Sequence, residues 1–408
     1  MKILFVGTLI SKDEMERLNS IGKRKASVAP NNYETMLVKG FAENGAQVDA
    51  MSVPAVAAYP GNPTALFHKR SELLSFGVTV QWIPFINVQA AKQASIQICT
   101  YRMVKQWLIE NKDVDEKCVI SFSIYPPYTK PLVNLCKKYH CHLSTVITDL
   151  PEYMYTWGKE NPIAAYFGNV MKKKMLTLQG QCDSYVLFTK KMAVRMMIEE
   201  KPYMVSEGFS DASIFHGVDV QEKNQKKTLV YAGNLSRLYG IRSLVDGFMR
   251  TEGDQELHFY GSGEDVPYIQ QCAEQDSRIH YFGSVSREEV LCALKRAHLI
   301  VINKPTADDY SNYSFSSKIL ECMVSGTPVL TTRVGGMPEE YYPYFYFIDD
   351  ETPQGIAKAV EGVLALSEET LAEKGRAAKQ FAVTEKNYLS QTKDILDFLS
   401  GELSRKAN

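Results

Sequence analysis

Two charged residues, Lys318 and Glu321, lie three positions apart at the start of a predicted helix, in a pattern suited to binding an anion. Ser316 and Ser317 are good N-cap residues, and Gly326 predicts where the helix ends. The first N–H groups of a helix lack partners and favour a negative charge. The helix dipole disfavours a cation there unless an anion is also bound, so Lys318 indicates a phosphate. A capped helix with an ion pair between positions i and i+3 is the alternative interpretation.

Several predicted strands end beside this helix start. In the C-terminal half, strands alternate with helices, and the strand exits fall at Gly233, Gly261, Gly283 and Asn303. The carboxyl ends of parallel strands meet at one edge of a sheet, where ligands bind, and glycine lets the backbone approach a ligand closely. Lys318 could bind a phosphate, and Glu321, one turn away, could accept hydrogen bonds from two hydroxyl groups. This combination suits a nucleotide-sugar diphosphate. Each glycine taken alone is more typical of an ordinary turn.

The N-terminal half shows the same alternation of strands and helices. Its strands are predicted over residues 3–9, 47–53, 77–86, 118–124, 143–148 and 184–188. Such alternation implies parallel βαβ units, so the chain is predicted to be α/β, with two Rossmann-like domains facing across a cleft. A linker is expected around 205–227. The predicted domains are 1–207, with a C-terminal helix over 386–408 packing back on it, and 208–385.

The composition is typical of an ordinary globular protein. Of 408 residues, 45% are hydrophobic and 23% are charged. The net charge of −1 gives no general attraction to nucleic acid, so no such partner is expected. No apolar run approaches the ~18 residues that a membrane-spanning helix needs. The first ten residues are interpreted as a buried strand and not as a signal peptide.

These features resemble the two-domain family-4 retaining glycosyltransferases, whose fold is called GT-B. The likeness is most specific over residues 230–233, 259–263, 281–285 and 314–330. The last segment is similar to the Ser-Phe-Pro-Ser-Lys helix start of the bacterial subgroup that builds capsular polysaccharide and exopolysaccharide, with Ser316 in the position of the proline. A looser likeness in the N-terminal half rests on residues 31–33 and 148–154.

The resemblance implies transfer of a sugar from a nucleotide diphosphate to an acceptor hydroxyl, with retention of configuration. Glu321 matches the family glutamate that accepts from the ribose hydroxyls. The preceding family glutamate would fall at Tyr313, and the usual Arg and Lys phosphate clamp at Asn234 and Tyr239. The expected donor-binding residues are Gly233, Asn234, Arg237, Gly261, Gly283, Lys304, Phe315, Ser316, Ser317, Lys318 and Glu321.

Lys318 and Asp149 are the predicted catalytic residues. Lys318 would stabilise charge on the leaving diphosphate. Asp149 follows a predicted strand of the N-terminal domain, and we expect it to bind the acceptor or act as a base, although it could also cap the local turn. Asn31 and Asn32, at the first strand–helix junction, are further predicted acceptor-binding residues, with a plain helix cap as the alternative.

No metal ion and no cofactor apart from the nucleotide-sugar substrate are expected. The resemblance implies metal-independent chemistry. The motif at 113–115 has the letters Asp-Val-Asp but precedes a strand, so it is interpreted as a solvated loop. The eight cysteines contain no Cys-x-x-Cys pair, and Cys136 to His142 lacks a second pair of ligands.

The resemblance indicates a type of acceptor and a cellular location, but it does not identify the acceptor. Acceptors in this subgroup are often glycans linked to polyprenyl diphosphate, so a cytoplasmic protein is expected, with or without contact to the inner face of the plasma membrane. The basic and apolar stretches 170–176 and 190–197 suit anionic lipid or, alternatively, a solvated helix face. The donor base stays open between uridine and guanosine. Two other functions remain, a non-catalytic partner subunit and, less favoured, a nucleotide-sugar 2-epimerase.

Overall fold

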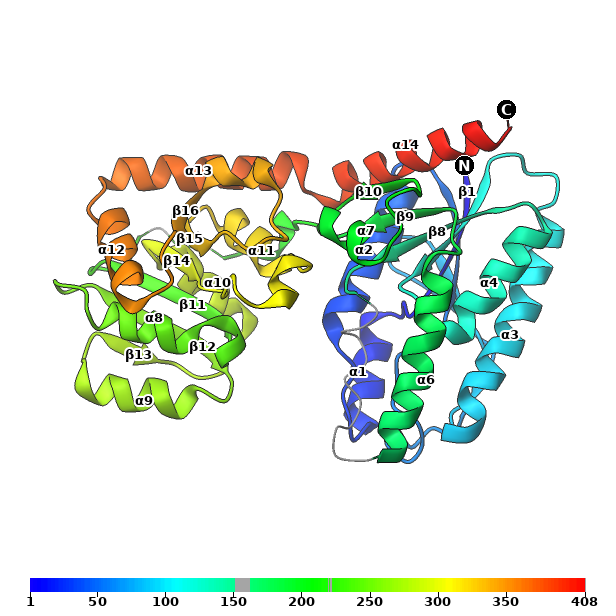
Figure 1. Ribbon diagram of the computed structural model, residues 1–408, viewed down its shortest axis with the longest axis horizontal. Coiled ribbons are helices and arrows are strands. Elements are labelled where there is room, and N and C mark those ends of the chain that lie inside the picture. The colour runs from blue at the N-terminus through cyan, green and yellow to red at the C-terminus, as the bar shows by residue number, and fades with distance from the viewer. Residues whose placement is uncertain (151–161, 219, 221, 408) are drawn as a thin grey trace. The chain divides into compact units, whose positions relative to one another are not determined.

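The chain divides into two compact α/β units. A computed structural model describes residues 1–150, 162–218, 220 and 222–407. The N-terminal unit comprises Met1–Glu207 and Tyr388–Asn408, and the C-terminal unit comprises Gly208–Asn387. In each unit helices pack on the faces of a mainly parallel sheet (Figure 1). The α/β class and the two Rossmann-like units predicted from the alternating pattern are confirmed.

The N-terminal unit contains an eight-stranded sheet and a small separate strand pair. The strands are β1 (Lys2–Gly7), β2 (Gln47–Ser52), β3 (Leu66–Phe67), β4 (Ser71–Leu73), β5 (Thr79–Trp82), β6 (Phe85–Ile86), β7 (Lys117–Phe122), β8 (His142–Ile147), β9 (Ser184–Leu187) and β10 (Tyr203–Val205). The large sheet has the order β10-β9-β8-β7-β1-β2-β5-β4, and β3 pairs with β6. Only the edge pair β4–β5 of the large sheet is antiparallel among the described strands. Because β1 is central, Ile3 to Val6 are fully buried.

Seven helices are described in the N-terminal unit. They are α1 (Lys12–Ile21), α2 (Val28–Glu43), α3 (Gln89–Glu110), α4 (Pro126–Lys138), α6 (Pro162–Gln179), α7 (Lys190–Arg195) and α14 (Tyr388–Ala407). The last helix packs against α2, where the Asn44 amide donates to the Leu389 carbonyl at 2.9 Å. Helix α1, which was not predicted from the sequence, follows β1 and is capped by the Ser11 side chain.

The C-terminal unit is built on a six-stranded parallel sheet. Its strands are β11 (Thr228–Asn234), β12 (Glu256–Ser262), β13 (Ile279–Tyr281), β14 (Leu299–Ile302), β15 (Val329–Thr332) and β16 (Phe345–Ile348). The order is β13-β12-β11-β14-β15-β16. Neighbouring residues of one strand point to opposite faces, so Leu229 belongs to one hydrophobic cluster and Val230 to the other. The sheet is therefore buried on both sides.

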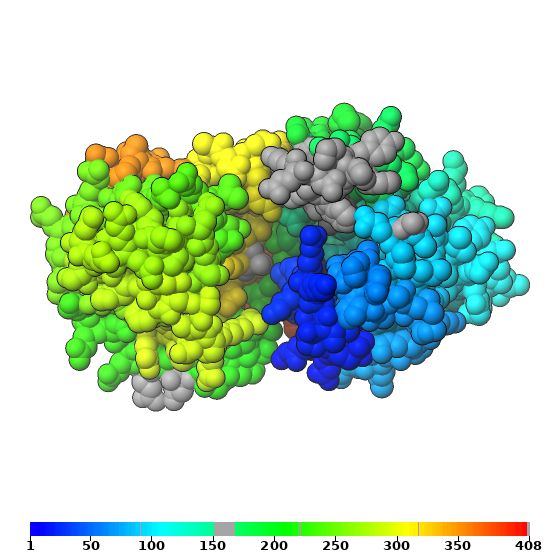
Figure 2. Space-filling view, turned by 90° about the horizontal axis from the view of Figure 1, so that it is seen from below, coloured from blue at the N-terminus to red at the C-terminus, as the bar shows by residue number. Residues whose placement is uncertain are grey.

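Helices of both hydrophobic clusters cover this sheet. They are α8 (Ile241–Phe248), α9 (Val266–Gln275), α10 (Arg287–Arg296), α11 (Ser317–Ser325), α12 (Pro353–Leu364) and α13 (Glu368–Glu385). Short 3₁₀ turns are η1 (Ala212–Phe215), η2 (Arg237–Tyr239), η3 (Asp309–Asn312) and η4 (Glu339–Tyr344). In Figure 2 the yellow-green chain around α9 forms the face of this unit that is turned to the viewer. Helix α13 was not predicted from the sequence.

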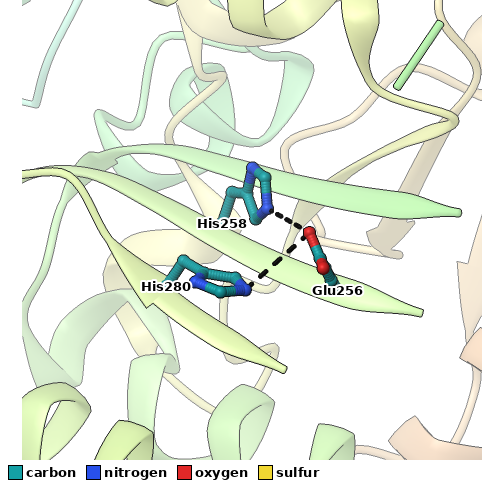
Figure 3. A group of neighbouring side chains, drawn as sticks. All are labelled: Glu256, His258 and His280. Carbon is teal, nitrogen blue, oxygen red and sulfur yellow. Dashed lines mark hydrogen bonds and ion pairs between the residues drawn. The ribbon is translucent and has the colours of Figure 1, made fainter. Parts of the chain in front are cut away.

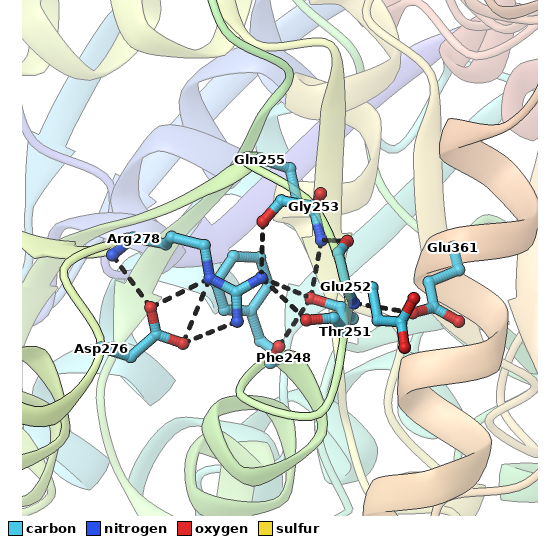
Figure 4. A network of polar contacts seen from close by, with 8 residues as sticks. All are labelled: Phe248, Thr251, Glu252, Gly253, Gln255, Asp276, Arg278 and Glu361. Atoms are coloured by element: carbon cyan, nitrogen blue, oxygen red, sulfur yellow. Dashed lines mark hydrogen bonds and ion pairs between the residues drawn. The ribbon is translucent and has the colours of Figure 1, made fainter.

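An arginine network fastens the strand starts of the C-terminal unit (Figure 4). The Arg278 guanidinium donates to the Thr251 and Gly253 carbonyls at 2.8 and 3.1 Å. It also pairs with Asp276 at 2.7 Å and lies 5.1 Å from the centre of the Phe248 ring. The hydrogen bond from Arg278 lowers the pKa of Asp276. The loop after α8 is thereby tied to the start of β13.

Candidate functional site

A pocket of about 420 Å³ opens at the carboxyl ends of β11 and β12 in the C-terminal unit. Strand ends, the loop before α10, and the helices α10 and α11 form its walls. The lining residues are Ala232, Gly233, Asn234, Tyr260, Gly261, Ser262, Ser284, Val285, Val290, Leu294, Lys318, Glu321 and Cys322. Five of the predicted donor-binding residues therefore share one pocket, namely Gly233, Asn234, Gly261, Lys318 and Glu321.

A pair of glycines opens the floor of the pocket. Gly233 and Gly261 are register partners on the parallel strands β11 and β12. Gly261 has φ of +132°, and a Cβ atom there would lie 1.9 Å from the Gly233 carbonyl oxygen. A Cβ atom on Gly233 would lie 2.5 Å from the Lys318 ammonium. No larger residue fits at Gly233 or Gly261 without movement of its neighbours. At these two positions the ends of β11 and β12 therefore expose the main chain to the pocket with no side chain above it.

Lys318 reaches over this bare backbone from the first turn of α11. Its ammonium lies 3.5 Å from the Ala232 carbonyl oxygen. The side chain is exposed, yet the pocket walls remove enough water from the ammonium to lower the pKa of Lys318, an effect that Cys322 and Glu321 oppose. A cation at the positive end of a helix, partly desolvated, is unfavourable by itself. A bound anion would reverse both penalties.

The start of α11 presents its backbone donors without a side-chain cap. Ser316 is the N-cap residue, and its side chain makes no capping hydrogen bond within the described structure. The helix ends as predicted at Gly326, which has φ of +78°. Glu321 lies one turn beyond Lys318, with its carboxylate 31% exposed and 4.0 Å from the Arg287 guanidinium. This arrangement offers donors for phosphate oxygens and an acceptor for hydroxyl groups.

The pocket also has an apolar wall that the sequence did not reveal. Tyr260 stacks on Phe282 with ring centroids 4.8 Å apart and planes inclined by 7°. Val290 and Leu294 lie one turn apart on α10 and face the same space. A planar ring and two aliphatic side chains are suitable for a nucleobase or a sugar face. The spacing of the two aliphatic residues was the available signal, but it is shared with any helix that packs on a core.

Six predicted donor residues lie outside the lining of this pocket, and three of them are Gly283, Arg237 and Lys304. Gly283 accepts a backbone hydrogen bond from Gly261 at 2.8 Å and precedes the lining residue Ser284. Arg237 is 66% exposed, with its nearest described carboxylate, Asp265, at 3.9 Å. The ammonium of Lys304 donates to the Ser314 hydroxyl. Contact of Arg237 or Lys304 with the donor would require a change of side-chain conformation.

Phe315 and the two serines have different roles in the fold. The Phe315 side chain is 6% exposed and packs against Tyr341, with ring centroids 5.1 Å apart. It anchors the segment before α11 in the hydrophobic core, so a side-chain contact between Phe315 and the donor is not supported. Ser316 and Ser317 bring their backbone groups to the start of α11.

The predicted acceptor residues lie after β8 and on α2 of the N-terminal unit. Asp149 follows β8, and its carboxylate accepts from Thr148 at 3.5 Å. Asn32 is exposed on α2. Asn31 is 5% exposed, and its amide bonds both the N–H and the carbonyl of Ile10, at 2.9 and 3.0 Å. Asn31 thus holds the loop after β1, and the structure does not support it as a direct acceptor contact.

A buried carboxylic acid lies beside Asn31. Glu34 is fully buried, and its carboxyl group accepts from the Thr8 N–H at 2.7 Å. Burial raises the pKa of Glu34 to about 8, against hydrogen bonds from Thr8 and Leu9 that lower it. A Cβ atom at Gly7 would lie 2.2 Å from the Glu34 carboxylate, so that strand end is also closely packed.

Two segments of the N-terminal unit bear on the predicted membrane and acceptor contacts. Residues 151–154 of the motif at 148–154 lie outside the described residues. In α7 and just after it, Val194 and Met197 are 61% and 81% exposed beside basic residues. Among the described helices, none is long and apolar enough to cross a membrane.

Comparison with known proteins shows what the C-terminal unit is similar to. Residues 226–365 match the family model described as glycosyl transferases group 1. All thirteen pocket-lining residues fall within that range. The chain is also similar to N-acetyl-alpha-D-glucosaminyl L-malate synthase of Bacillus anthracis, with 28% identity over 119 residues, which are 28% of this chain. That match spans 29% of the length of the relative.

Solved structures resemble the whole chain. The sucrose-phosphate synthase of Thermosynechococcus elongatus aligns with a TM-score of 0.61 and 13% identity, covering 99% of this chain and 100% of that one. HepE of Anabaena, solved in complex with UDP, aligns with a TM-score of 0.60 and 13% identity, covering 98% and 100%. The predicted GT-B fold is confirmed.

Proposed function

We propose that this chain, whose C-terminal unit belongs to the group 1 glycosyltransferases, transfers a sugar from a nucleotide diphosphate to a glycan or a lipid-linked glycan, with retention of configuration. The observation that carries the proposal is the position of Lys318. Its ammonium lies over the bare glycine floor of the pocket, one helical turn from Glu321 and within the matched region.

The donor is proposed to occupy the pocket by three kinds of contact. The diphosphate lies against Lys318 and the first N–H groups of α11, which stabilise charge on the leaving oxygens. Glu321 accepts from the two ribose hydroxyls. The base lies against the wall formed by Tyr260, Val290 and Leu294. Uridine is the first base to test, because HepE was solved in complex with UDP.

The finer features of the reaction rest on the sequence resemblance. The proposed chemistry needs no metal ion, since the cation for the leaving group is Lys318. Acceptor binding is assigned to the N-terminal unit, with Asp149 as the candidate base and Asn32 as a contact. Cell-surface polysaccharide synthesis in the cytoplasm, with an acceptor on polyprenyl diphosphate, is the proposed setting. The exposed Val194 and Met197 among basic residues support contact with an anionic membrane surface.

One substitution favours a second candidate function. Tyr313 occupies the position of a family glutamate that contacts the donor sugar, so a partner subunit that binds the nucleotide without transfer is the alternative. Such a subunit would bind UDP or GDP, but it would neither transfer nor hydrolyse a nucleotide sugar.

The test begins with the melting temperature of the purified chain in the presence of UDP, GDP, ADP and CMP, with and without magnesium. A ligand that binds only the native state raises the melting temperature by mass action. We expect one nucleoside diphosphate to do so without metal. Slow release of that nucleotide from its sugar conjugate would then support the transferase. A shift without any turnover would favour the partner subunit, and no shift with any nucleotide would refute both.

A further inference from the structure

Three metal-binding side chains converge on the edge of the C-terminal sheet, apart from the pocket. Glu256 and His258 lie on β12, and His280 lies on the neighbouring edge strand β13. His258 and His280 are register partners, and Glu256 lies two residues before His258, so all three occupy one face. Figure 3 shows both imidazole rings directed at the same carboxylate oxygen of Glu256.

The distances suit a single small cation. The Nε2 atoms of His258 and His280 lie 3.0 and 3.7 Å from Oε2 of Glu256, and the three ligand atoms are all within 4.8 Å of one another. A tetrahedral zinc ion with bonds of about 2.0–2.1 Å places its ligand atoms about 3.3 Å apart. Small rotations of the rings would therefore bring three ligands to one ion. The side chains of Glu256, His258 and His280 are 22%, 13% and 39% exposed.

The contacts within the cluster do not satisfy all three groups. The Nε2 atom of His280 is buried and has no hydrogen-bond partner among the described residues. His258 is hydrogen-bonded to Oε2 of Glu256. His280 is directed at the same oxygen, but its Nε2 atom lies 3.7 Å away, which is too far for a hydrogen bond. The other oxygen, Oε1 of Glu256, pairs with the Lys226 ammonium at 3.0 Å. A cation bound at Oε2 would replace the hydrogen bond to His258 and would also engage the Nε2 atom of His280, which has no hydrogen-bond partner among the described residues.

We propose that Glu256, His258 and His280 bind one divalent transition-metal ion, with Zn²⁺ as the preferred ion and water as the fourth ligand. Two imidazoles and one carboxylate are a donor set that selects zinc, cobalt, nickel or copper over magnesium and calcium.

The site is distinct from the donor pocket in position and in role. Tyr260, the first lining residue of the pocket on β12, lies two residues beyond His258, or about 7 Å along the strand. The ion would cross-link the edge strand β13 to β12 and would not touch the leaving group. Its binding is therefore expected to stabilise the unit, with no requirement for the ion in transfer.

The experiment uses the full chain after chelator treatment, titrated at pH 7.5 with Co²⁺ alone. Four-coordinate Co²⁺ has a strong visible absorption that octahedral Co²⁺ lacks. We expect this absorption to saturate at one ion per chain and to disappear when Zn²⁺ is added. His258→Ala and His280→Ala should each weaken binding at least about tenfold. The matched control is His68→Ala, which removes an exposed histidine from the N-terminal unit and should change nothing.

Two further measurements keep the result interpretable. Circular dichroism checks that each variant folds, and His280→Gln replaces His280→Ala if the latter does not. Lys226→Met removes the ammonium from the second carboxylate oxygen, and it should leave affinity unchanged or increase it. The proposal is overturned if Co²⁺ shows no saturable tetrahedral absorption, or if the absorption survives unchanged in folded His258 and His280 variants.

Discussion

Replacing Lys318 by methionine removes the cation above the glycine floor while keeping a flexible side chain of similar length. The ammonium is the predicted partner of the diphosphate, and a hydrogen bond to a charged group contributes about 1.5–3 kcal/mol. Such a loss corresponds to a roughly 10- to 150-fold weaker affinity. Because the Lys318 side chain is exposed, we expect the lower part of this range at physiological salt, and a larger effect at low salt.

The assay is calorimetric titration of UDP and of uridine into both proteins. Lys318→Met should weaken UDP but leave uridine unchanged, since uridine carries no phosphate. Lys358→Met is the matched control, because it removes an exposed lysine from α12 of the same unit. Equal losses for UDP and uridine would show that the variant disturbs the pocket as a whole. Unchanged binding of both, with measurable affinity, would refute the phosphate role of Lys318.

Three more predictions follow from other parts of the structure. Gly261→Ala should lower the free energy of unfolding by at least about 2 kcal/mol and abolish nucleotide binding, because its Cβ atom would collide with Gly233; denaturant titration and calorimetry test both. Burial raises the pKa of Glu34 to about 8, above its unfolded value of about 4.3, so its contribution to wild-type stability should fall as the pH rises from about 4.3 to about 8 and level off above that, a slope that Glu34→Gln should remove in urea titrations. Arg278→Ala should cost about 2–3 kcal/mol and reduce the loss of stability in acid, because Asp276 then no longer has a lowered pKa; urea midpoints at pH 7 and pH 3 measure this.

The strands were predictable because they carry a strong local signal. Buried parallel strands are continuous apolar runs, and β1 and β7 start within one residue of the predicted positions. The two helices that the sequence did not reveal, α1 and α13, lack such a signal. Only Met15 and Leu18 are buried in α1. In α13 the buried positions include Gly375, Ala378 and Ala382, so its packed face is made partly of small residues, which a hydrophobic pattern does not detect.

Pocket residues could be predicted only where their type and their position within a helix or strand are enough to indicate a binding role. Lys318 and Glu321 could be found because a helix start fixes the spacing and the chemistry together. Lys304 also follows a strand, but its side chain turns to Ser314, and the direction of a side chain is not encoded in its distance from a strand end. Residues that reach a site from another helix, such as Val290, depend on packing across the sheet.

The pocket combines features that are unfavourable for the empty protein. Gly261 has a backbone angle that few residues adopt, Lys318 is a partly desolvated cation at the positive end of a helix, and the start of α11 has no side-chain cap in the described structure. Each lowers stability when no anion is present. A bound diphosphate would accept hydrogen bonds from the uncapped N–H groups, pair with the ammonium and fill the space above the glycines. A bound diphosphate thus explains why the protein keeps all three unfavourable features. The alternative interpretation, a capped helix with a surface ion pair, explains none of them.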